Sequence, residues 1–75
     1  MKAVVILQNA DGSWAEKGSA GRCAFDADTM SGVCARAKLF AKGRPHKIEV
    51  QPSNNMYNNP TAIYYIDAEG NEVGR

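Results

Sequence analysis

The hydrophobic residues of this chain fall into short runs that glycine, proline and asparagine separate. The first run, KAVVILQ at 2–8, is rich in β-branched residues and stops at the turn sequence NADG, as is typical of a strand. Its apolar residues occupy both alternation phases, so we expect both faces of this strand to be at least partly covered. The pattern therefore predicts an interior strand at 2–8.

The next segment, SWAEKGSAGRCAF at 13–25, is predicted to return antiparallel to the first strand. Gly18 and Gly21 interrupt it, which indicates a bulge or a broken strand. Cys23 and Phe25 share one alternation phase. We expect both of these side chains on the inner face of the sheet.

A single helix is predicted within residues 26–45. Asp28 is the expected N-cap, and Lys42 is expected in the last turn. Gly43 and Pro45 follow as stop signals. At about 100° per residue the apolar positions form one stripe, which we expect to pack on the sheet. The residues of this stripe are Met30, Val33, Cys34, Ala37, Phe40 and Ala41.

The second half of the chain predicts two more strands and a short hairpin. HKIEVQ at 46–51 alternates between polar and apolar residues, which is typical of a strand that is wetted on one face. TAIYYI at 61–66 is the fourth strand, and 67–73 turns it back into a short terminal ribbon. Tyr64 and Tyr65 are adjacent in that strand, so one must face the helix and the other must face away.

The element order predicts an α+β fold, a single ββαββ domain over residues 1–75 in which one helix packs on one face of an antiparallel sheet. A chain of 75 residues has room for one small core. Its hydrophobic fraction of 44% and charged fraction of 23% are typical of globular proteins rather than disordered ones. No apolar run approaches the length of a membrane span, so we expect no membrane partner and a cytoplasmic location.

The formal net charge of +1 hides an uneven distribution. No acidic residue occurs between Met30 and Ile48. The basic residues of that segment are Arg36, Lys38, Lys42, Arg44 and Lys47, with His46 beside them. The helix dipole accounts for part of this pattern, because bases are favoured near a helix end. The same pattern also favours a surface that binds a protein partner or a nucleic acid.

Two apolar features lie outside the expected core. Leu39 points away from the packing stripe, and the predicted loop at 52–60 carries Met56 and Tyr57 among asparagines. These two loop residues either plug one end of the core or contact a partner. The candidate partner-binding residues are therefore Arg36, Lys38, Leu39, Lys42, Arg44, Lys47, Met56 and Tyr57.

The sequence holds few residues for catalysis. Cys23 and Cys34 lie eleven positions apart, which fits neither a C-x-x-C redox motif nor a zinc site. We expect buried free thiols, with a structural disulfide as the alternative. His46 is expected to point outward, away from these thiols. The sequence has one histidine, so we expect no metal site. Glycine-rich phosphate-binding motifs do not occur, so we expect no nucleotide cofactor, and without a motif for catalysis we expect no enzymatic activity.

Three short strings, MKA at the start, ARAK in the predicted helix and KIEV in the strand after it, resemble small phage-encoded anti-CRISPR proteins. The resemblance is to those that inhibit type I Cascade complexes with a one-helix, antiparallel-sheet fold, and as architecture it covers most of the chain. It implies an inhibitor in the host cytoplasm that binds Cas subunits of a CRISPR effector where target DNA would lie. It implies no chemistry of its own.

The leading hypothesis from the sequence is therefore a non-catalytic protein-interaction module of the inhibitor kind. One alternative is a small DNA- or RNA-binding module that uses the five basic residues between Met30 and Ile48. Another alternative is a structural or regulatory homodimer that buries the sheet face without a helix.

Overall fold

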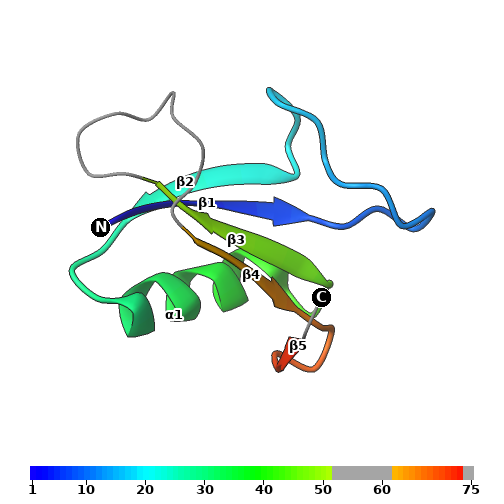
Figure 1. Cartoon of the computed structure of the whole chain (residues 1–75). Helices are drawn as coiled ribbons and strands as arrows, with labels where there is room; N and C mark the ends of the chain where they lie inside the picture. The colour runs from blue at the N-terminus through cyan, green and yellow to red at the C-terminus, as the bar shows by residue number, and fades with distance from the viewer. Residues whose placement is uncertain (52–61, 74–75) are drawn as a thin grey trace.

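The computed structural model describes residues 1–51 and 62–73, which form five strands and one helix (Figure 1). In chain order the elements are β1 (Lys2–Leu7), β2 (Arg22–Asp26), α1 (Met30–Ala41), β3 (His46–Val50), β4 (Ala62–Ile66) and β5 (Glu72–Val73). Neighbouring strands are all antiparallel, in the order β2-β1-β3-β4-β5. The predicted α+β fold with one helix on one sheet face is confirmed.

β1 lies inside the sheet, between β2 and β3. Val5 and Ile6 have relative exposures of 0% and 1%. Because adjacent residues of a strand point to opposite faces, both faces of the sheet are covered at β1. The prediction of an interior strand is confirmed.

The core lies between α1 and the sheet. Val33 and Ala37 of the helix are fully buried against Val5 and Ile48 of the central strands, with Ala3 completing the cluster. The short side chains of the helix let its backbone approach the sheet closely. α1 therefore packs mainly over β1 and β2, and Figure 1 shows it on one side of the sheet only.

The helix begins and ends one residue away from the predicted caps. Thr29, not Asp28, is the N-cap, because its Oγ1 accepts a hydrogen bond from the backbone N of Gly32 at 3.1 Å. Lys42 is not in the last turn but is itself the C-cap, with φ 51° and ψ 48°. These angles lie in the left-handed region, which is unfavourable for residues other than glycine because their Cβ approaches the following carbonyl oxygen.

The segment predicted to form the second strand is a strand only from Arg22 onward. Its earlier part folds back on β1, where Trp14 forms an isolated bridge with Gln8. A tight turn connects the two bridged residues. In this turn Asp11 Oδ1 accepts hydrogen bonds from the backbone N and Oγ of Ser13, at 2.9 and 2.6 Å. These two hydrogen bonds lower the pKa of Asp11. The turn brings Trp14 to the sheet face opposite α1.

Tyr64 and Tyr65 point to opposite faces, as predicted. Tyr64 packs against the core under α1. Tyr65 lies on the other face, where its ring centroid is 5.9 Å from that of Trp14. Lys47 reaches the same place from β3, with Nζ 4.8 Å from the Trp14 ring and 3.5 Å from Glu49 Oε2. Part of the face without a helix is thus occupied by Trp14.

The predictions for the cysteines and the histidine hold only in part. Both thiols are free, as predicted, rather than joined in a disulfide, but neither is buried: Cys34 is exposed and Cys23 is half-buried. Cys34 lies at the edge of the helix stripe, on the side where the sheet extends past α1. His46 is buried rather than outward, because it shares an alternation phase with Ile48. The predicted loop tip with Met56 and Tyr57 lies outside the described residues.

Lys42→Gly should stabilise the protein by about 1 kcal/mol, because glycine adopts left-handed angles without the Cβ penalty. Urea unfolding of the variant and the wild type measures the difference. Lys38→Gly is the matched control: it removes the same side chain inside the helix and should cost about 1 kcal/mol. Equal losses in the two variants would contradict the left-handed cap.

Phe40→Ala should destabilise the protein by roughly 2–4 kcal/mol, because Phe40 is half-buried and packs edge-on against Phe25 at a centroid distance of 6.0 Å. Leu39→Ala, one position earlier, should change the free energy of unfolding by less than about 0.5 kcal/mol, since Leu39 is 75% exposed. Thermal and urea unfolding compare the two variants. If Leu39→Ala proved the more damaging, the helix would present a different face to the sheet.

Candidate interaction surface

The outer surface of α1 carries an isolated apolar side chain. Leu39 is the most exposed large hydrophobic residue of the described chain, at 75%. Ala35, Arg36 and Lys42 lie one helical turn away from it, and all three are exposed. The prediction that Leu39 points away from the core, among small and basic residues, is confirmed.

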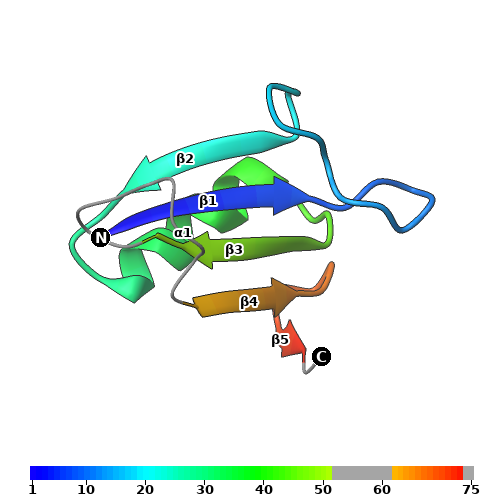
Figure 2. The same cartoon turned by 45° about the horizontal axis from the view of Figure 1, so that its top comes forward.

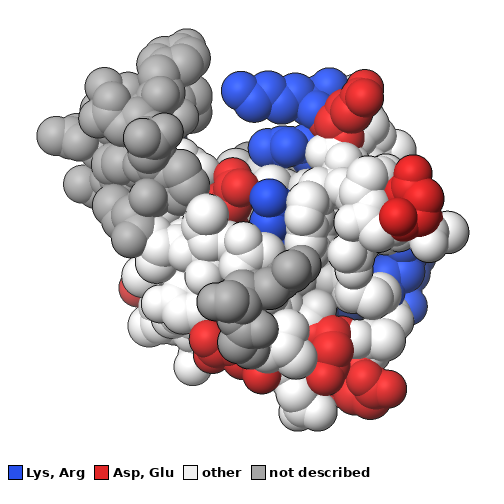
Figure 3. All heavy atoms as spheres, turned by 45° about the vertical axis from the view of Figure 1, so that its right-hand side comes forward, with Lys and Arg blue, Asp and Glu red and all other residues white. Residues whose placement is uncertain are grey.

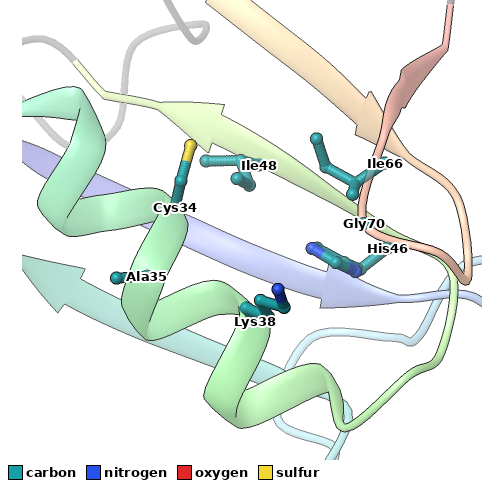
Figure 4. Close-up of a pocket in the computed structure, with 7 residues that line it drawn as sticks. All are labelled: Cys34, Ala35, Lys38, His46, Ile48, Ile66 and Gly70. Carbon is teal, nitrogen blue, oxygen red and sulfur yellow. The ribbon is translucent and has the colours of Figure 1, made fainter.

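A groove of about 190 Å³ runs beside this surface (Figure 4). It exists because α1 packs over β1 and β2 while β3 and β4 extend the sheet beyond the helix. One wall is helical and the other belongs to β3, β4 and the turn after β4. The lining residues are Cys34, Ala35, Lys38, His46, Ile48, Ile66 and Gly70.

The floor and walls of the groove differ in chemistry. Ile48 and Ile66 supply an apolar floor from β3 and β4. Cys34 and Lys38 project into the groove from α1, and Figure 4 shows them directed toward the strand residues. The groove therefore fits an apolar side chain, with a cation at its rim.

The imidazole of His46 lines the groove and is held by a backbone carbonyl two residues earlier. Its Nδ1 lies 2.9 Å from the carbonyl oxygen of Arg44. Because a carbonyl oxygen only accepts, Nδ1 is the donor in this contact. Among the described residues no hydrogen bond joins the Cys34 thiol to this imidazole, so a nucleophile and a base share the groove without being paired.

The exposed leucine and the groove are continuous. Ala35 lies one helical turn before Leu39 on the outer surface and also lines the groove. Lys38, which is exposed, lines the groove as well. We call this combined region the helix-groove surface. Its residues are Leu39, Ala35, Arg36, Lys38 and Lys42, together with the groove lining.

The predicted basic residues do not all belong to this surface. Arg36, Lys38 and Lys42 lie on or next to the helix. Arg44 lies past its end, where Nη2 donates a hydrogen bond to the backbone oxygen of Gln8 at 3.0 Å. Lys47 lies on the opposite sheet face, with a side-chain exposure of 16%. The structure therefore separates the predicted basic cluster into three places.

The groove was missed by the sequence analysis, although one signal for it was present. His46 and Ile48 share an alternation phase, which already places the histidine on the helix side. The contribution of Ile66 and Gly70 depends on the pairing of β3 with β4, which the local pattern does not determine.

Acidic side chains are absent from α1 and frequent at the β4–β5 end of the sheet. Figure 3, which turns the right-hand side of Figure 1 forward, shows several acidic side chains along the lower part of that face, and further acidic side chains next to Lys and Arg in its upper part. The end of the sheet at β4 and β5 carries Asp67, Glu69 and Glu72. The acid-free stretch predicted from the sequence thus lies on α1, whereas acidic and basic side chains are mixed elsewhere, as at Lys47 and Glu49.

Comparison with known protein families, with curated proteins and with solved structures finds no match for this chain. The described helix is too short to cross a membrane. In residues 1–51 and 62–73, no three His, Cys, Asp or Glu side chains come together as ligands for a metal ion.

Proposed function

We propose that this chain is a non-catalytic protein-interaction module that binds its partner through the helix-groove surface. The observation that carries the proposal is the 75% exposure of Leu39 beside a groove with an apolar floor. An apolar anchor next to a pocket, with charges at the rim, is the arrangement that concentrates binding energy at protein interfaces.

The surface favours a partner of defined chemistry. An apolar side chain of the partner fills the groove over Ile48 and Ile66. Acidic groups of the partner meet Arg36, Lys38 and Lys42, which no acid on α1 neutralises. Such charge complementarity mainly increases the association rate and orients the encounter.

The finer proposal is an anti-CRISPR-like inhibitor in the host cytoplasm that binds Cas subunits of a type I effector and blocks target DNA binding. The resemblance of the element order, the size and the strings MKA, ARAK and KIEV to such inhibitors supports it. A channel that holds DNA is basic. Glu69 and Glu72, both exposed, are therefore the groups suited to face that channel, while α1 docks beside it.

Leu39→Asp and Lys38→Glu should each weaken partner binding at least about tenfold, because one inserts a charge at the anchor and the other reverses a rim charge. Their melting temperatures should stay near that of the wild type. Capture from a bacterial lysate with mass spectrometry, followed by calorimetry on the recovered partner, measures the effect. Lys17→Glu, at an exposed site remote from α1, is the control and should bind normally.

A purified type I Cascade complex tests the finer proposal in the same series. Wild-type protein should bind it and prevent binding of target DNA, and Glu69→Lys with Glu72→Lys should abolish that competition. A captured partner unrelated to CRISPR would overturn the finer proposal and leave the coarser one. Equal recovery of the same partner by wild type and Leu39→Asp would overturn the coarser one.

Nucleic-acid binding is a second candidate function, favoured by the acid-free, basic helix. Since Arg44 and Lys47 lie apart from α1, only Arg36, Lys38 and Lys42 form a continuous footprint. A gel shift should then show affinity that falls with roughly the third power of salt concentration, not the fifth. Binding that does not respond to salt, or no shift at low salt, removes this candidate.

A further inference from the structure

β2 is an edge strand whose outer side faces no other described strand (Figure 2). Two hydrogen bonds fix the direction of its backbone groups: Leu7 N donates to Gly21 O at 2.9 Å, and Ala27 N donates to Met1 O at 3.0 Å. In an antiparallel ladder the residues that bond to the neighbouring strand alternate with those that bond away from it. Arg22, Ala24 and Asp26 therefore direct their backbone N–H and C=O groups outward from the sheet, where the N–H of Arg22 also makes a long hydrogen bond of 3.4 Å to Ser19 O.

The sequence of this edge is complementary to itself. β2 reads RCAFD, with a base at one end, an acid at the other and Ala24 in the middle. When two such strands run antiparallel and pair at Ala24, Arg22 of each copy lies opposite Asp26 of the other. We propose that a second copy of this chain docks on the β2 edge and extends the sheet across a two-fold axis at Ala24.

The side chains have the orientation that this pairing needs. Arg22, Ala24 and Asp26 share the sheet face opposite α1, so the two charge pairs form on that face. Asp26 has a side-chain exposure of 67%, and its Oδ1 lies 3.3 Å from the N-terminal ammonium of Met1. One guanidinium nitrogen of Arg22, Nη1, donates to Ala15 O at 3.2 Å. This contact holds Arg22 in place while its other donors are left for the partner's carboxylate.

The charges also explain why the occupant is a second copy. Charged side chains on an edge strand normally prevent pairing with other chains, because most incoming strands place a like charge or an apolar residue opposite them. An incoming strand can pair with β2 when it places an acid opposite Arg22 and a base opposite Asp26. A second copy of β2 does so when it runs antiparallel to the first. The two-fold axis is perpendicular to the sheet, so both copies of α1 remain on the same face.

Sedimentation equilibrium over micromolar to millimolar chain concentrations tests the proposal. The wild type should reach a dimeric mass within this range. Asp26→Arg and Arg22→Asp should each raise the dissociation constant at least about tenfold, since each places like charges opposite one another twice. The double variant Arg22→Asp with Asp26→Arg should recover the dimer, because it restores opposite charges across the axis.

The double variant also distinguishes lost strand pairing from a damaged monomer. It carries both substitutions, so if either one disrupted the monomer, the double variant would not recover the dimer. Ala24→Pro is a second probe: it removes an outward N–H that β1 does not use, so the monomer should keep its melting temperature and lose the dimer. A wild type that stays monomeric throughout would overturn the proposal. So would a dimer whose dissociation constant is unchanged in both single charge variants, since another surface would then hold it.

Discussion

The contact of Val33 and Ala37 with Val5 and Ile48 is the interaction on which the rest of the structure depends. It joins the only helix of the described chain to the two central strands. The helical partners are short, so α1 lies close to the sheet and covers mainly β1 and β2. A core of this size gives a narrow stability margin, and removing any large side chain next to it is costly.

The same contact determines where binding surfaces arise. Because α1 is centred over one half of the sheet, β3 and β4 extend past it and leave the groove with its apolar floor. Leu39 stays on the outer side of the helix, with no described element to cover it. On the opposite sheet face Trp14 fills part of the space that a second helix layer would occupy. Incomplete coverage by one helix thus creates the helix-groove surface.

The sequence patterns predicted the features that depend on local periodicity. Strand alternation placed Tyr64 and Tyr65 on opposite faces, and the helical period placed Leu39 outward. The failures concern features that depend on how elements meet. Exposure of Cys34 depends on the sideways position of α1 over the sheet, which the helical period does not determine. The place of Trp14 depends on its pairing with Gln8 across a turn.

The central claim is that α1 leaves the groove open, and the labelling rate of the Cys34 thiol in native protein tests it most directly. In a Cys23→Ser background, Cys34 should react with a thiol reagent at a rate close to that of the urea-unfolded chain, because its side chain is exposed at the groove wall. Labelling that occurs only as fast as the protein unfolds would contradict the account, since the groove would then be closed.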